Sequence, residues 1–154
     1  MAVAVAKIPA KRVDIVKIQM VKDGSISYPQ RFINTPQDAA QLGRNFLQDL
    51  DREAVLVICL DVKNQPTAIN MVSLGTLHNS LVHPRELFKT AILANSGGLI
   101  VVHNHPSGIP EPSKDDVTMT ERLVDAGAIL GIDILDHIII GHNSYASFRE
   151  MGLM

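Results

Sequence analysis

Two histidines stand one residue apart where an apolar strand is expected to end. The run Gly98–Val102 leads directly into His103, Asn104 and His105. Side chains of a strand alternate between its two faces, so the two imidazoles point the same way if the strand continues through Asn104. Two imidazoles on one side can share a metal ion at about 2.0–2.1 Å from each nitrogen. The spacing therefore predicts a metal site at this strand end.

A third ligand is available a short distance along the chain. Proline and glycine residues interrupt positions 106–112 and predict an ordered loop. Ser113 then opens a helical pattern, and the loop can bring Asp116 back as an oxygen ligand, which leaves the fourth position of a tetrahedral site for water. Ser-x-x-Asp is also a helix-capping arrangement, with Ser113 at the N-cap and Asp116 at N3. The pattern alone leaves both roles open.

The complete motif resembles that of a known family. His-x-His-Pro, six residues, Ser, two residues and Asp is similar to the JAMM motif of the MPN/JAB metalloprotease fold, and the segments 103–108 and 136–141 resemble its bacterial RadC branch. The similarity covers roughly Phe46 to Gly152. It implies an α/β fold of the α+β type, with helices packed on a mixed, largely antiparallel sheet in the cytidine-deaminase-like MPN/JAB architecture. We expect residues 1–10 to form a flexible leader and residues 11–154 a single RadC-like domain.

The resemblance also implies the roles of individual residues. It implies a zinc site of His103, His105 and Asp116, with Ser113 supporting an oxyanion. A JAMM site further needs a glutamate as general base. The family places that glutamate at the start of a central strand well upstream, which matches Glu53, just before the apolar run 54–60.

Glu86 is the other candidate for the general base. It lies in the first turn of an expected helix, where a carboxylate stabilises the helix N-terminus without any chemical role. Glu53 also has a structural alternative, as a solvated residue at a strand end. The position of Glu53 before a central strand favours it over Glu86.

The remaining histidines are treated separately. His137 follows Asp136, and it is interpreted either as a satisfied histidine within the sheet or as a residue behind the metal ligands whose ring the adjacent acid orients. His78, His83 and His142 lie in turn-like stretches and are expected to be exposed, with no assigned role. The stretch from His78 to His83 could cover the cleft.

Local patterns predict the other elements. Thr35 as N-cap, Pro36 at N1 and Asp38 at N3 begin a helix that is expected to reach about Leu50. The other expected elements are strands at 12–21, 54–60, 68–74, 98–102, 132–140 and 144–148, helices at 84–95 and 113–130, and a hairpin turn at 22–24.

Composition limits the cellular setting. The chain has 154 residues, 46% of them hydrophobic, and no apolar run of the roughly 18 residues that a membrane span needs. Its single cysteine, Cys59, lies in an apolar run and is expected to be buried packing. These features predict a soluble, cytoplasmic protein without a membrane partner. They give no oligomeric state.

Two classes of function remain. The first is a zinc hydrolase of amide or isopeptide bonds in a peptide or protein, in which Glu53 moves the proton. The alternative is a nucleic-acid-binding or nuclease module associated with DNA repair, the process after which the RadC relatives were named. The net charge of −2 does not support DNA binding, and the RadC relatives' helix-hairpin-helix region is not expected in this shorter chain. A zinc deaminase is excluded, because its Pro-Cys-x-x-Cys segment needs two cysteines.

Overall fold

The computed structural model describes residues 8–75 and 82–154. Most of the expected leader and most of the stretch from His78 to His83 therefore lie outside the described residues. The elements are α1 (Pro36–Leu47), β1 (Ala54–Leu60), β2 (Pro66–Leu74), α2 (Pro84–Leu93), β3 (Gly98–Asn104), α3 (Lys114–Leu130), β4 (Asp133–Ile140) and β5 (Tyr145–Ser147). The predicted mixed α/β fold is confirmed.

The five strands form one sheet in the order β2-β1-β3-β4-β5. Neighbours pair antiparallel except β3 and β4, which are parallel and are joined by the crossover helix α3. Every residue of β1 and β3 is buried, as expected for the centre of a sheet covered on both sides. The sheet is therefore mixed and largely antiparallel, as the resemblance implied.

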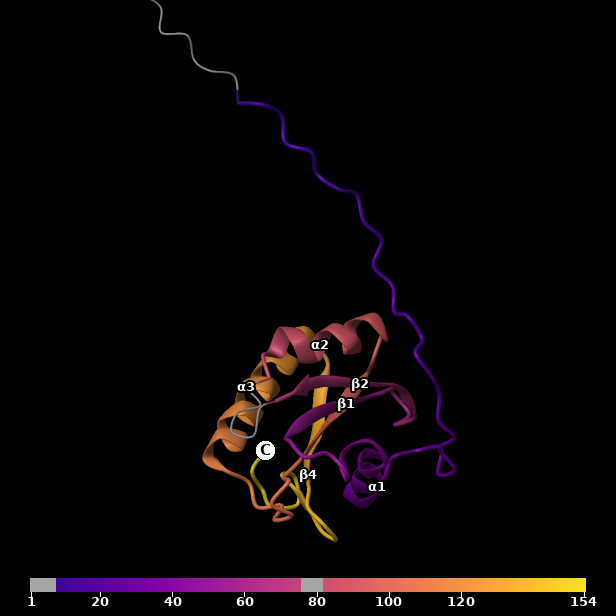
Figure 1. Ribbon diagram of the computed structural model, residues 1–154. Helices are drawn as coiled ribbons and strands as arrows, with labels where there is room; N and C mark the ends of the chain where they lie inside the picture. Colours follow the sequence, from indigo (N-terminus) through magenta and orange to yellow (C-terminus); the bar gives the residue numbers. More distant parts are fainter. Residues whose placement is uncertain (1–7, 76–81) are drawn as a thin grey trace, which may run out of the picture.

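Helices cover both faces of the sheet (Figure 1). Alternate strand residues such as Leu56, Val102 and Ile140 form a core with α1. Their neighbours, such as Val55 and Val101, form a second core with α2 and α3. Because side chains alternate along a strand, His103 belongs to the face that α2 and α3 cover.

Helix α1 packs closely on the sheet at Gly43. Thr35 and Asp38 form the predicted capping box at its start, and the helix ends at Leu47, before the expected Leu50. A Cβ atom on Gly43 would lie 2.7 Å from Cγ1 of Val102. This glycine, which lowers helix propensity, is therefore explained by the close approach of α1 to β3.

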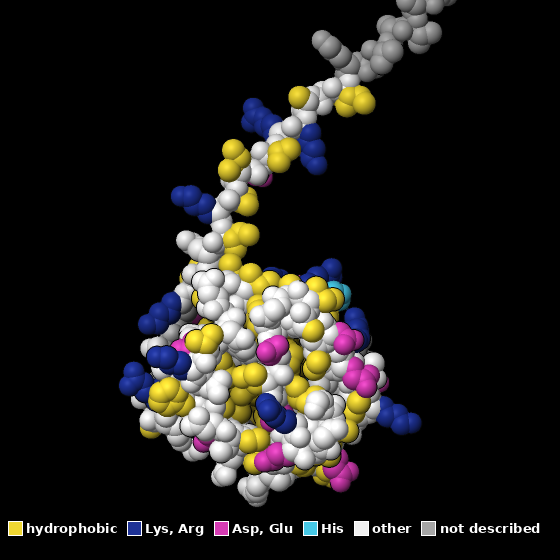
Figure 2. Space-filling model, turned by 180° about the vertical axis from the view of Figure 1, so that it is seen from behind, with side chains coloured by type: hydrophobic (Ala, Val, Ile, Leu, Met, Phe, Trp, Pro, Cys, Tyr) yellow, Lys and Arg dark blue, Asp and Glu magenta, His cyan; other side chains and the backbone are white. Residues whose placement is uncertain are grey.

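The strand predicted at 12–21 is wrong. Residues 8–27 are extended but belong to no strand, and their large apolar side chains are exposed, with Ile15 completely accessible. Figure 2 shows this segment projecting from the domain. Period-two apolar spacing reports how side chains would alternate, but a strand also needs a hydrogen-bonding neighbour, and no described strand lies beside this segment.

Among the residues described, no helix combines the length and the apolar character that crossing a bilayer requires. The prediction that Cys59 is buried packing is confirmed.

We expect Gly43→Val to lower the free energy of unfolding by about 1–3 kcal/mol, because the added side chain overpacks the contact with Val102. Gly24→Ala is the matched control, since a Cβ atom there has no neighbour within 4 Å. Denaturant unfolding measures both. Equal midpoints for Gly43→Val and wild type would show that α1 can move away from β3 without loss.

Candidate metal centre

The end of β3 places the two histidines as their spacing predicts. His103 is the next-to-last residue of the strand and is buried, and His105 follows the strand end. The Nε2 atoms of the two rings lie 3.0 Å apart. Nδ1 of His105 lies 2.8 Å from the carbonyl oxygen of Ile109, so this ring donates from Nδ1 and directs Nε2 toward His103.

Asp116 completes the cluster from the first turn of α3. Its Oδ1 lies 3.3 Å from Nε2 of His103, and its Oδ2 lies 3.4 Å from Nε2 of His105. Within the described part of the chain, these three residues form the one group whose ligand atoms lie close enough together to hold a metal ion. The structure thus brings together the three residues that the sequence motif singled out.

The spacing of the three donors fits a tetrahedral ion. Bonds of about 2.0–2.1 Å at tetrahedral angles place neighbouring donor atoms about 3.3 Å apart. The three donor separations, 3.0, 3.3 and 3.4 Å, are close to this value. Two imidazoles and a carboxylate are also the donor types that zinc accepts. The residues present therefore fit a zinc ion with three protein ligands.

Charge in the cluster is arranged to attract a cation. Burial alone would raise the pKa of the Asp116 carboxyl, but His103 and His105, which in their protonated forms hydrogen-bond to it, outweigh burial and hold the pKa well below its usual range. The pKa of His105 is raised, chiefly by its hydrogen bond to Asp116, with a smaller contribution from the negative charge of Glu53. Asp116 is therefore ionised, as a ligand must be.

Ser113 fulfils the capping alternative. Its Oγ accepts from the backbone N–H of Asp116 at 3.1 Å, and its own N–H and hydroxyl both donate to Oδ2 of Asp116 at 2.7 Å. The capping box thus fixes the carboxylate that faces the histidines. Ser113 is exposed, so its hydroxyl remains accessible from solvent.

His137 lies within the sheet and also contacts a candidate ligand. Its Nε2 is 2.7 Å from Nδ1 of His103, and its Nδ1 is 2.6 Å from Oγ1 of Thr120. Burial lowers the pKa of His137 well below its usual value, and the neighbouring His103 lowers it further. The interpretation of His137 as a satisfied histidine within the sheet is confirmed, and its contact with His103 is compatible with the other interpretation. The expected orienting role of Asp136 is wrong, because Thr120 contacts the ring while Asp136 accepts from Ser147 and from two backbone N–H groups.

Glu53 lies immediately before β1, close enough to the cluster for its charge to act on His105. In the β1–β3 pairing Val55 lies opposite His103, so alternation places Glu53 on the same face as the two histidines. Asn104 holds the backbone on both sides of Glu53: its Oδ1 accepts from the N–H of Ala54 at 2.8 Å, and its Nδ2 donates to the carbonyl oxygen of Arg52 at 3.0 Å. The carboxylate is therefore mounted on a backbone segment fixed to β3.

Comparison with known proteins agrees with the motif and the fold. The sequence-family model of the RadC-like JAB domain matches residues 33–153. The chain belongs to this family. It is 52% identical over 122 residues to a UPF0758 protein of Desulforamulus reducens, covering 79% of this chain and 54% of that protein. It is 45% identical over 129 residues to a UPF0758 protein of Methanosarcina mazei, covering 84% of this chain and 56% of that protein. The chain thus spans about half the length of these curated relatives, whose name states no activity.

Glu86 lies on the surface of the RadC-like domain rather than in the cluster. It stands in the first turn of α2, and its carboxylate forms an ion pair with Lys89 at 2.6 Å. The hydrogen bond from Lys89 lowers the pKa of Glu86. These contacts explain Glu86 as a helix-stabilising residue, which leaves Glu53 as the better candidate for a general base.

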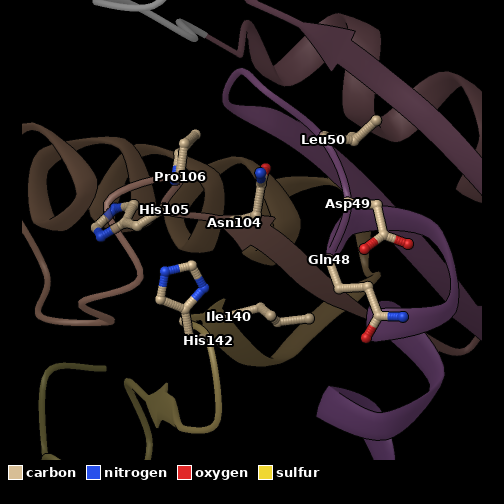
Figure 3. A pocket seen from close by; sticks show the side chains of 9 residues that line it. Gln48, Asp49, Leu50, Asn104, His105, Pro106, Ile140 and His142 are labelled. Atoms are coloured by element: carbon tan, nitrogen blue, oxygen red, sulfur yellow. The ribbon is translucent and has the colours of Figure 1, made fainter.

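A small pocket of about 140 Å³ adjoins the cluster in the RadC-like domain (Figure 3). His105 and His142 lie on one side of it, and Gln48 and Asp49 lie on the other. Arg44 holds the loop that carries His142 by donating to the carbonyl oxygens of residues 141, 142 and 144. These bonds fix the backbone on the His142 side of the pocket.

Sequence reasoning assigned no role to Asn104 or Thr120. Both are buried polar residues. A polar residue at a position that periodicity assigns to the core needs a hydrogen-bonding partner, and that is the signal that could have identified both.

We expect Asn104→Leu to lower the free energy of unfolding by about 1–3 kcal/mol, because it leaves the N–H of Ala54 and the carbonyl of Arg52 without their partner. The exposed Asn45→Leu on α1 is the matched control. Denaturant unfolding and hydrogen exchange at the Ala54 amide measure the effect. Unchanged exchange at Ala54 would show that Asn104 does not hold this segment.

Proposed function

We propose that this domain is a zinc-dependent hydrolase that cleaves an amide or isopeptide bond in a peptide or protein. The observation that supports it most directly is the triad of His103, His105 and Asp116, whose donor spacing matches a tetrahedral zinc site. Membership of the JAB family supports a JAMM-type metallohydrolase fold.

Zinc, when bound, supplies a Lewis acid and lowers the pKa of water to about 7. His103, His105 and Asp116 would hold it, and the negative charge of Asp116 would offset part of the ion's charge. The protein groups around the triad then position the substrate and move protons.

Glu53 is the general base in this proposal. Its carboxylate takes a proton from the attacking water and returns it to the leaving amine, so that the nitrogen departs as a neutral group. Two features support the assignment: Glu53 shares a face with the histidines, and Asn104 holds the backbone on both sides of it. A fixed backbone limits the range of positions that the Glu53 carboxylate can occupy.

Ser113 is the proposed oxyanion donor. Its hydroxyl is exposed beside the cluster and donates to Asp116 in the structure. To stabilise a tetrahedral oxyanion, the hydroxyl turns from Oδ2 of Asp116 to the substrate oxygen. The backbone N–H of Ser113 continues to hold Oδ2 at 2.7 Å, so the carboxylate keeps its orientation.

We expect about one zinc per chain in protein purified without chelators, and loss of that zinc in His103→Ala, because the mutant keeps only two of the three donors. Elemental analysis measures the metal, and circular dichroism checks that the mutant folds. A folded wild-type protein that fails to retain added zinc would contradict the proposed function.

Glu53→Gln separates binding from proton transfer. We expect this variant to retain zinc and to lose activity about 10²–10⁴-fold on peptide or isopeptide substrates, because the amide cannot accept the proton. Glu86→Gln is the matched control and should keep wild-type activity, since Glu86 pairs with Lys89 on the surface. Retained activity in Glu53→Gln would exclude Glu53 as the base.

A further inference from the structure

Three hydrogen bonds connect the backbone of α3 to the buried side of His103. Oγ1 of Thr120 lies 2.7 Å from the carbonyl oxygen of Asp116 and 2.6 Å from Nδ1 of His137. Nε2 of His137 lies 2.7 Å from Nδ1 of His103. The chain of contacts begins at the backbone of one candidate ligand and ends on the ring of another.

Counting protons gives each bond a direction. The carbonyl oxygen of Asp116 can only accept, so the single hydroxyl proton of Thr120 is donated to it. Oγ1 must therefore accept from Nδ1 of His137. The ring of His137 is completely buried with no carboxylate against it, so it is neutral and carries this one N–H.

The proton position on His137 determines the donor in its hydrogen bond with His103. Since the proton of His137 is on Nδ1, its Nε2 is an acceptor, and Nδ1 of His103 must be the donor. Nε2 of His103 is left with a lone pair on the side that faces His105 and Asp116.

We propose that Thr120 and His137 are positioning residues that hold His103 as the Nδ1-protonated tautomer and so present its Nε2 lone pair to the metal. This inference rests on the proposed metal site. Neither residue touches the metal or the substrate, and both act through the ligands. His105 is oriented separately, through its bond to Ile109.

Thr120→Val and Thr120→Ser test the relay. Valine has nearly the same shape but cannot accept from His137, whereas serine keeps the hydroxyl. We expect Thr120→Val to weaken zinc binding about 10–100-fold and Thr120→Ser to bind close to wild type. Competition with a chromophoric chelator measures the zinc dissociation constants, and circular dichroism confirms folding. Equal affinities for the valine and serine variants would overturn the proposal.

The tautomer itself is read independently of zinc and of activity. Nitrogen NMR of the imidazoles in metal-free protein at about pH 9, above the ordinary histidine pKa of about 6.5, should show the proton of His103 on Nδ1. A proton on Nε2 would overturn the relay even if Thr120→Val failed to fold. The expected tautomer in a protein that binds no zinc would support the relay's directions while contradicting the proposed function.

A second and independent observation concerns residues 8–27, here called the arm. It is extended and unpaired, and the exposed apolar side chains on it are Ile8, Val13, Ile15, Val16, Ile18, Met20, Val21 and Ile26. A soluble surface rarely presents so many apolar side chains without a partner. The near-alternating spacing from Val13 to Met20 suits pairing with a strand.

The described residues include a sheet edge, β2, that carries no charged side chain, although it has Pro66 as its first residue and two register shifts against β1. β2 is at the edge of the sheet, and no described strand lies beyond it. Natural edge strands are commonly protected by charged side chains, but β2 contains none, and Met71 and Leu74 are exposed on it. Charge also favours the contact: residues 1–27 carry five basic and two acidic side chains, whereas residues 28–154 carry nine basic and fourteen acidic.

We infer that the arm of one copy adds a strand to the β2 edge of a second copy. Main-chain hydrogen bonds then cover the edge and the apolar side chains of the arm pack against the partner. The chain lies beside the turn that precedes β2 at Ile33, six residues after the arm ends, where the N–H of Ile33 donates to the carbonyl of Asn64 at 2.9 Å. The arm itself leads away from its own domain (Figure 1). Reciprocal exchange gives a closed dimer with two identical contacts.

Light scattering coupled to size exclusion tests this inference. We expect the full chain to be a dimer, and a variant with both Ile15→Lys and Ile18→Lys to be a folded monomer, as should Met71→Lys on β2. Ile129→Lys, which changes an apolar residue on α3 that is 86% exposed, is the matched control and should remain dimeric. A monomeric wild type would overturn the inference. So would an arm that pairs with β2 of its own chain, or a monomer whose arm binds duplex DNA in a salt-dependent way.

Discussion

The register between β1 and β3 is the constraint on which the site depends. Because Val55 lies opposite His103, the strand start that carries Glu53 and the strand end that carries the histidines meet on one face. A slip of one residue would turn Glu53 to the α1 side of the sheet. Asn104 opposes such a slip, since its side chain binds backbone groups on both sides of Glu53. Asn104, the residue between the two histidines, thus hydrogen-bonds the backbone at the start of the neighbouring strand.

The start of α3 adds the candidate oxygen ligand through ordinary helix capping. The same carboxylate accepts from the N-cap residue and faces the imidazoles, so the interaction that begins the helix also orients Asp116. The two sequence alternatives for Ser113 and Asp116, capping and chemistry, therefore do not exclude each other. A ligand held by a capping box is oriented before any ion binds, which reduces the entropy lost on binding.

Local patterns in the sequence predict much of this arrangement. Alternation along one strand predicts that His103 and His105 share a side, and the Ser-x-x-Asp spacing predicts the start of α3. They do not predict which strands pair, so the position of Glu53 beside the histidines depended on the family resemblance. The bond between Asn104 and Ala54 spans fifty residues of sequence, and no local periodicity carries it. The prediction of a strand at 12–21 was wrong for a related reason, because alternation does not show whether a partner strand is present.

The dual nature of His137 follows from the topology. The parallel pairing of β3 and β4 sets Val101 beside His137, on the face that α3 covers, and α3 is the crossover that joins these two strands. The helix that delivers Asp116 at its first turn therefore passes over His137 one turn later, at Thr120. The crossover unit of β3, α3 and β4 thus supplies all three candidate ligands, the ring behind one of them and the hydroxyl that contacts that ring. A histidine in this place satisfies its hydrogen bonds within the core by the same contacts that hold His103, so its structural role and its proposed positioning role depend on the same bonds.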